Sequence, residues 1–268
     1  MSAEHDFPSG TVWLVGAGPG DPELLTRKAE RLLRAADIVF YDALVGKGVL
    51  DLIPHATQRR SVGKRAGRHS VPQQMICDTI TRAALSGMRV VRLKGGDPSI
   101  FGRSHEEIEA CRKSDIPVHV CAGVTTASAA AASLGTSLTT RGLARRLTFV
   151  TAHTVKGAAP VLDWAALADP EATLAVYMGK AAAPQLAQRL MEAGLSGDTP
   201  VALIENVSLP GERIFTTTLA LMPLSVQTAL GTGPALILIG AVTATEMAEA
   251  RAEASQSSGF DPSIGAFS

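Results

Sequence analysis

The chain has 268 residues, of which 46% are hydrophobic, and its equal numbers of acidic and basic side chains give a formal net charge of +0 at pH 7. This length is enough for one large domain or two smaller ones, each with a substantial core. The balanced charge argues against a general nucleic-acid-binding protein. The longest apolar runs, such as 234–242, are too short to span a bilayer.

The N-terminus and the cysteines indicate the compartment. The first ten residues, MSAEHDFPSG, are polar and lack a secretory pattern. Cys77, Cys111 and Cys121 are odd in number and form no C-x-x-C pair. We therefore expect reduced cysteines, no metal site and a cytoplasmic protein.

The first half of the chain alternates short apolar runs with helical patterns. This alternation predicts a mainly parallel sheet covered by helices. We expect strands at 11–16, 38–41, 57–62, 89–93 and 117–121, and helices at 22–36, 72–86 and 104–114. Asp21, placed before Pro22, is typical of the N-cap of the first helix. Ser104 and Glu107 fit a capping box at the start of the third.

The second half has a different pattern. An alanine-rich helix at 125–134 precedes it, and strands are expected at 147–152, 173–178, 200–206, 212–218 and 234–240. Too few residues separate the third and fourth of these strands for a helix, and Pro210-Gly211 is typical of a hairpin turn. The second sheet is therefore expected to be mixed.

We expect two α/β domains with the active site in the cleft between them. The N-terminal domain covers 1–123 and the C-terminal domain covers 124–246. The last stretch, 247–268, is rich in alanine, serine and glycine and is expected to be a flexible tail.

The first glycine-rich loop, VGAGPGD at 15–21, follows the first predicted strand. A dinucleotide-binding loop requires a third glycine where this chain has Asp21, and a carboxylate there would repel a pyrophosphate. A glycine-rich turn at the carboxyl end of a parallel strand still brings bare backbone close to a ligand.

Four loops converge on one edge if the first sheet is parallel, and they are 16–21, 42–44, 94–103 and 122–126. In the third of these loops, Asp97 follows two glycines. Its carboxylate suits a ribose or an amine, or else it caps a tight turn. Asp42 has three interpretations: a catalytic carboxylate, the ribose acid of a dinucleotide fold, or a turn residue.

A basic stretch, RRSVGKRAGRH at 59–69, contains five lysine or arginine residues and no acid. It is either a solvated surface loop or a site for a polyanion. Paired N–H donors could be added to such a site by Arg103, Arg141, Arg145 and Arg146. Few aromatic residues accompany these cations, so a stacking platform for RNA is not indicated.

Five segments together resemble the tetrapyrrole (class III) methyltransferases: VGAGPGDPELLT, YDALV, VGKRAGRHSVPQ, RLKGGDPSIFGR and LAVYMG. The likeness covers about 11–242 and is closest to the branch that methylates uroporphyrinogen III. It implies that S-adenosylmethionine lies folded in the interdomain cleft and leaves as S-adenosylhomocysteine. It also implies transfer of two methyl groups, at C2 and C7, to give precorrin-2 by way of precorrin-1.

The resemblance also implies the site residues. By motif match, the methyl donor would be contacted by Pro19, Gly95, Gly96, Asp97, Ile100, Thr125, Thr126, Met178, Val207 and Ala235. Asp42 matches the proposed proton acceptor and Lys64 the proposed proton donor, while Arg103, Glu106 and Arg141 match substrate-handling positions. The expected partners are a small tetrapyrrole and a second copy of the chain in a homodimer, with no nucleic acid and no membrane.

The sequence departs from the family pattern in three places. Ser104-His105 stands where Gly-Gly is usual, 122–126 replaces a proline-led P-G-I-T-S, and Asn206-Val207-Ser208 replaces R/N-G-T. These changes affect the expected loop shapes and the Val207 contact. Some bifunctional relatives carry an added dehydrogenase–chelatase domain, for which this chain has no room, so a monofunctional enzyme is expected.

Two alternatives stay open. One is a methyltransferase of the same fold that acts on a later precorrin, on RNA or on protein. The other is a nicotinamide-dependent oxidoreductase that uses Asp42 to bind ribose.

Overall fold

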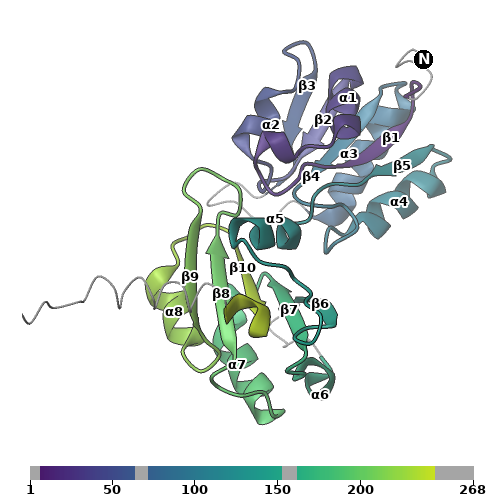
Figure 1. Ribbon diagram of the computed structural model, residues 1–268. Helices are drawn as coiled ribbons and strands as arrows, with labels where there is room; N and C mark the ends of the chain where they lie inside the picture. Colours follow the sequence, from purple (N-terminus) through teal and green to yellow (C-terminus); the bar gives the residue numbers. More distant parts are fainter. Residues whose placement is uncertain (1–6, 64–71, 153–161, 245–268) are drawn as a thin grey trace, which may run out of the picture. The chain divides into compact units, whose positions relative to one another are not determined.

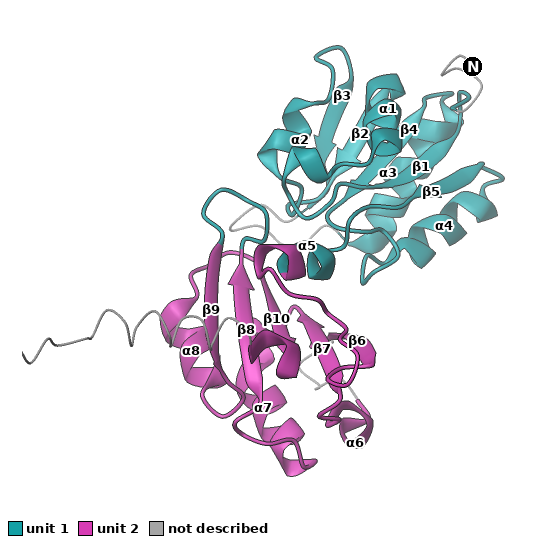
Figure 2. Cartoon of the chain, in the orientation of Figure 1, with its two compact units in different colours: residues 1–130, 206–212 teal, residues 131–205, 213–268 magenta. Residues whose placement is uncertain are grey.

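The computed structural model describes residues 7–63, 72–152 and 162–244 (Figure 1). The chain divides into two compact units (Figure 2). Unit 1 comprises residues 1–130 with 206–212, and unit 2 comprises residues 131–205 with 213–268. The domain limits expected from the sequence stay a prediction, and the tail at 247–268 lies outside the described residues.

Unit 1 contains a five-stranded, all-parallel sheet in the order β3-β2-β4-β1-β5. Its strands are β1 (Val12–Gly16), β2 (Ile38–Tyr41), β3 (Gln58–Ser61), β4 (Val90–Lys94) and β5 (Val118–Cys121). Each strand coincides with one expected from the sequence. Because all the strands run in one direction, their carboxyl ends lie at one edge of the sheet.

Helices cover both faces of this sheet (Figure 1). They are α1 (Arg27–Ala35), α2 (Lys47–Asp51), α3 (Gln73–Leu85) and α4 (Ser104–Lys113). The short turn η2 (Pro22–Leu24) precedes α1, and α5 (Thr126–Ser133) crosses the limit between the two units. Alternate residues of β1 enter different cores: Val15 packs with Leu33 of α1, whereas Leu14 packs with Ile80 of α3. Both faces are therefore apolar, as expected for a buried parallel sheet.

One expected helix start and one expected cap are wrong. Asp21 accepts a hydrogen bond from the Glu23 N–H at 2.9 Å, but it caps only the short η2 turn. Helix α1 begins later, because the Thr26 hydroxyl accepts from the Ala29 N–H at 3.1 Å and provides a second N-cap. At α4, Ser104 does not cap the helix, because its hydroxyl donates to the Pro98 carbonyl instead.

Unit 2 contains a mixed sheet in the order β6-β7-β10-β8-β9, which confirms the expectation. Its strands are β6 (Arg146–Thr151), β7 (Ala172–Tyr177), β8 (Pro200–Glu205), β9 (Arg213–Thr218) and β10 (Ala235–Ile239). Strands β6 and β7 pair in parallel, and the other pairs are antiparallel. The hairpin predicted at Pro210-Gly211 joins β8 to β9.

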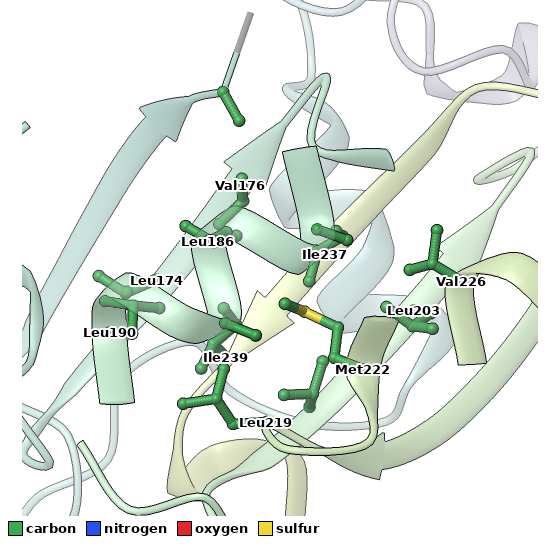
Figure 3. Close-up of a cluster of buried hydrophobic side chains, with 14 of the residues drawn as sticks. Leu174, Val176, Leu186, Leu190, Leu203, Leu219, Met222, Val226, Ile237 and Ile239 are labelled. Atoms are coloured by element: carbon green, nitrogen blue, oxygen red, sulfur yellow. The ribbon is translucent and has the colours of Figure 1, made fainter. Parts of the chain in front are cut away.

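The core of unit 2 lies between its sheet and helices α7 and α8 (Figure 3). The helices of this unit are α6 (Trp164–Leu167), η3 (Lys180–Ala182), α7 (Ala183–Glu192), α8 (Met222–Ala229) and η4 (Ala241–Thr243). Leu190 of α7 and Met222 of α8 are fully buried against strand residues such as Leu203 and Ile237. Within the described ranges, the helices are all too short or too polar to cross a bilayer.

We expect Leu203→Ala to lower the free energy of unfolding by ~2–5 kcal/mol, because Leu203 is fully buried and its loss leaves a cavity. Leu224→Ala is the matched control, since Leu224 is 59% exposed, and it should change stability little. Urea unfolding followed by circular dichroism measures both. Equal effects of the two changes would contradict the described core.

Candidate functional site

The loops after β1 and β4 continue the sheet beyond its carboxyl edge. The Gly18 N–H donates to the Gly96 carbonyl at 3.2 Å, and the Gly96 N–H donates to the Gly18 carbonyl at 2.7 Å. The Ala17 N–H also donates to the Lys94 carbonyl at 2.7 Å. These bonds fix the two glycine-rich loops side by side.

Glycine backbones touch where the loops after β1, β4 and β5 meet. A Cβ added to Gly16 would lie 2.6 Å from the Gly123 Cα, and one added to Gly123 would lie 2.4 Å from the Gly96 carbonyl oxygen. Contacts this short are not possible for a side chain against backbone. The three loops can converge only because Gly16 and Gly123 lack a side chain.

Asp97 joins the loop after β4 to the loop after β5. One carboxylate oxygen accepts from the Ser99 N–H at 2.7 Å, and the other accepts from the Gly123 N–H at 2.9 Å. The turn-capping interpretation of Asp97 is therefore confirmed. Because an ionised carboxylate has about four acceptor positions, this half-buried group keeps capacity for a ligand donor.

Asp42 follows β2 and lies between backbone and a buried cation. Its Oδ1 accepts from the Leu44 N–H at 3.1 Å, which confirms the turn interpretation, and its Oδ2 lies 3.5 Å from a terminal nitrogen of Arg92. A Cβ on Gly63 would lie 2.2 Å from the Ala43 nitrogen, so the chain leaving β3 packs against the backbone beside Asp42. The carboxylate retains 25% exposure, so a ligand can still reach it.

The β8–β9 turn, which belongs to unit 1, contacts the first glycine loop. The Asp21 N–H donates to the Ser208 hydroxyl at 3.1 Å, and a Cβ on Gly20 would lie 2.4 Å from the Leu209 side chain. Val207 is buried between Asn206 and Ser208, which both have left-handed backbone with φ of 57° and 58°. The predicted contact residue Val207 therefore lies close to the loop that holds Pro19.

Arg103 and Glu106 form a fork-shaped ion pair at the start of α4. Two guanidinium nitrogens donate to the two carboxylate oxygens at 2.7 and 2.8 Å. The hydrogen bonds from Arg103 lower the pKa of Glu106, and the attraction of the Arg103 charge adds to this effect. Arg103 has left-handed backbone with φ of 56°, so the turn projects both groups into solvent at the end of the β4–α4 loop.

A buried charged cluster lies beneath the loops, and the sequence reasoning missed it. Arg92 and Lys94 of β4 donate to Glu107 of α4 at 3.0 and 2.8 Å, and all three side chains are at most 5% exposed. Burial and the nearby Arg92 charge lower the pKa of Lys94, while Glu107 opposes that shift. Two features of the sequence could have indicated this cluster. Two cations interrupt the apolar strand VVRLK, and Glu107 shares a helix face with the buried Cys111.

The remaining predicted residues of unit 1 border the same edge. The Ile100 N–H donates to the Asp97 carbonyl at 3.2 Å, and the Thr125 carbonyl accepts from the Ser128 N–H at 3.0 Å at the start of α5. The position of a Cβ on Gly96 lies 3.7 Å from the Thr126 hydroxyl. Gly95 precedes Gly96, and Lys64 lies outside the described residues.

Three predicted residues belong to unit 2. Met178 directly follows β7, has left-handed backbone with φ of 55° and is exposed. Ala235 begins β10, and the register that pairs Leu236 with Tyr177 places Ala235 and Met178 at the same end of that sheet. Arg141 is exposed in a tight turn that is closed by paired hydrogen bonds between Thr140 and Ala144.

The fold and loops define an α/β protein with one parallel and one mixed sheet, whose candidate ligand edge is built from glycine backbone. The model of the Tetrapyrrole (Corrin/Porphyrin) Methylases matches residues 11–222. The chain belongs to this family.

Two curated relatives are similar over most of this chain. A uroporphyrinogen-III C-methyltransferase from Paracoccus denitrificans is 46% identical over 235 residues, which cover 88% of this chain and 82% of the relative. A siroheme synthase from Azotobacter vinelandii is 46% identical over 233 residues, which cover 87% of this chain. The chain spans about half the length of that synthase, 50%.

Solved structures share the fold. A uroporphyrin-III C-methyl transferase from Thermus thermophilus, complexed with S-adenyl homocysteine, is 38% identical with a TM-score of 0.76. The match covers 88% of this chain and 99% of that one. A cobalt precorrin-4 methyltransferase is 26% identical with a TM-score of 0.78, and the match covers 91% of this chain and 98% of that one.

We expect Gly123→Ala to lower the free energy of unfolding by ~1–3 kcal/mol, because the new methyl group would press on the Gly96 carbonyl and force the loops apart. Gly197→Ala is the control, since its Cβ would meet only side-chain atoms, the Ala220 Cβ at 3.3 Å and the Met191 sulfur at 3.4 Å. Thermal unfolding measures both. A Gly123 variant as stable as the control would show that the loops do not need this close contact.

Proposed function

We propose that this chain is an S-adenosylmethionine-dependent methyltransferase that methylates uroporphyrinogen III at C2 and C7, giving precorrin-2 by way of precorrin-1. The observation that carries the proposal is the 46% identity, across 88% of the chain, to the Paracoccus denitrificans enzyme of that name. The Thermus thermophilus transferase with S-adenyl homocysteine supports the choice of methyl donor.

The residues at the edge of unit 1 suit this donor. When bound, S-adenosylmethionine supplies a methyl group made electrophilic by its sulfonium. Gly95 and Gly96 offer a surface without side chains, and Asp97 has unused acceptor positions for a ribose hydroxyl or an amine. Buried Val207 and half-buried Ile100 add apolar contact at the same edge. We propose that Pro19, Thr125, Thr126, Met178 and Ala235 complete the donor site.

The exposed cations suit the substrate, which carries eight carboxylates. Arg103 presents a guanidinium fork, the geometry that binds carboxylates by paired N–H bonds. A substrate carboxylate can replace Glu106 on this fork, so Glu106 keeps the fork extended until substrate arrives. Arg141 and Lys64 would bind further carboxylates, and Lys64 would also donate a proton.

The reaction joins a nucleophilic ring carbon to the methyl group. The methyl–sulfur bond breaks with its electron pair left on sulfur, and a proton leaves the macrocycle. Asp42 can accept that proton, because its carboxylate stands at the sheet edge with partial access to solvent. Such general-base assistance is typically worth ~10²–10⁴-fold in rate. Alignment of carbon and methyl supplies the rest.

A second candidate is methylation of a later precorrin. The cobalt precorrin-4 methyltransferase favours it, since its TM-score of 0.78 is as high as that of the uroporphyrin transferase. Its lower identity, 26% against 38%, ranks it second. A nicotinamide oxidoreductase is not proposed, because Asp21 replaces the third glycine and the family is a methylase family.

Two expectations complete the proposal. We propose a cytoplasmic location, in keeping with the three free cysteines, and a homodimer, as the resemblance implies. Sedimentation analysis tests the homodimer directly, and a monomer at micromolar concentration would refute it.

We expect incubation with S-adenosylmethionine and enzymatically generated uroporphyrinogen III to yield a product heavier by two methyl groups, with a singly methylated intermediate at early times. Mass spectrometry of the oxidised products measures this. In the control reactions, precorrin-3 or precorrin-4 replaces uroporphyrinogen III as the substrate. Methylation of either of these alone would replace the proposed substrate with a later precorrin.

We expect Asp42→Asn to slow methyl transfer by ~10²-fold or more while both ligands still bind. Asparagine keeps an oxygen for the Leu44 N–H, so the turn survives while the proton acceptor is lost. Single-turnover kinetics measure the rate, and calorimetry measures donor affinity. A rate near that of the wild type would leave Asp42 with only its role in the turn.

We expect Arg103→Ala to raise KM for the tetrapyrrole while the affinity for S-adenosylhomocysteine stays unchanged. The same change should raise the pKa of Glu106 towards its ordinary value, because the hydrogen bonds from Arg103 lower it. Arg112→Ala is the control, since Arg112 lies in the last turn of the same helix. Loss of donor affinity in the Arg103 variant would place this residue in the donor site instead.

A further inference from the structure

Arg92 connects two carboxylates that stand on different elements. Its Nε donates to Glu107 at 3.0 Å, and one terminal nitrogen donates to the Leu93 carbonyl at 2.8 Å. The other terminal nitrogen lies 3.5 Å from the Asp42 Oδ2. Every nitrogen of the guanidinium therefore has a partner, which fixes the plane of the group beneath the site.

Glu107 anchors this arrangement from α4. It is 1% exposed and also accepts from the Lys94 ammonium at 2.8 Å and from the Gln73 amide at 3.2 Å. Arg92 and Lys94 carry two positive charges and Glu107 carries one negative charge. The buried cluster therefore has a net charge of one positive. Asp42 is the carboxylate that faces this excess charge, and it alone of the four charged groups has substantial exposure.

We propose that Arg92 is a positioning residue for Asp42: its guanidinium holds the carboxylate in a fixed orientation at the sheet edge, while Glu107 holds Arg92 in place. This inference rests on the proposed function, in which Asp42 accepts the proton. The position of Asp42 then depends on the buried charges of β4 and α4 as well as on the turn that follows β2.

The charged surroundings of Asp42 support the inference. Strand β4 supplies Arg92 and Lys94, and α4 supplies Glu107 through Arg92. The chain leaving β3 faces Asp42 with the backbone of Gly63. The negative charge of Asp42 acts to raise the pKa of Lys94, which couples the two groups electrostatically. No other charged partner of Asp42 occurs in the part of the chain that the structure describes.

The test follows the Asp42 carboxyl carbon by NMR during pH titration of the free protein, with isotope-labelled aspartate. The resonance is assigned by its absence in Asp42→Asn. We expect Arg92→Gln to move the titration midpoint upward, because the cation that lies 3.5 Å from the Asp42 Oδ2 is gone. Glu107→Gln should move it downward, because Arg92 and Lys94 are then left without their counter-charge.

Two further variants separate charge from structure. Gln73→Ala removes one hydrogen bond from the same Glu107 oxygen without a change of charge, so the midpoint should stay. Arg92→Lys keeps the charge but not the fork, so the midpoint should stay near that of the wild type while the methyl-transfer rate falls. If Glu107→Gln does not fold, the variants of Arg92 and Gln73 are sufficient to test the inference.

An unmoved midpoint in folded Arg92→Gln would overturn the inference, as would upward shifts in both the Arg92 and the Glu107 variants. The titration needs no substrate. A wild-type protein that does not methylate uroporphyrinogen III would refute the proposed function while leaving the charge balance established. An active wild type with an unmoved midpoint would refute only the role of Arg92.

Discussion

Close contact between glycine backbones at the carboxyl edge of the parallel sheet is the constraint on which the site depends. Gly16, Gly96 and Gly123 come from loops after three different strands, and a side chain on Gly16 or Gly123 would collide with backbone. The contact holds the loops at a separation that no other residue allows. It also leaves an edge made of peptide groups, to which Asp97 adds a carboxylate.

Beneath this edge the protein uses buried charge. Glu107 binds two cations of β4, so helix α4, which follows the turn at Arg103, is fixed to the central strand of the sheet. Removing one member of such a cluster is costly, because it leaves a buried charge without a partner. The backbone therefore shapes the proposed donor site, while ionised side chains position the groups proposed to handle the substrate and the proton.

Much of the fold could be predicted from local signals. Short apolar runs marked most strands, although β3 (QRRS) is polar, and Pro210-Gly211 marked the hairpin. The start of α1 was mispredicted because Thr26 supplies a competing cap a few residues after Asp21. Helix α4 begins at residue 104 as expected, but its predicted capping box was wrong because the Ser104 hydroxyl donates to the Pro98 carbonyl.

The interior of the site was harder to predict, because its contacts join segments far apart in the chain. Adjacent glutamates illustrate this: Glu106 pairs with Arg103 in solvent, whereas Glu107 is buried with Arg92 and Lys94. A motif match treats the two positions alike, and only the helical face shared with Cys111 distinguishes them. Likewise, the link between Asp21 and Ser208 follows from tertiary structure alone.

We propose that the methyl donor binds to the glycine-built edge of unit 1. Amide hydrogen exchange with and without S-adenosylhomocysteine tests it most directly, since exchange reports protection of individual backbone segments. We predict slower exchange in the segments 18–21, 95–100 and 123–126. Protection confined to other segments, or no protection at saturating ligand, would contradict the account.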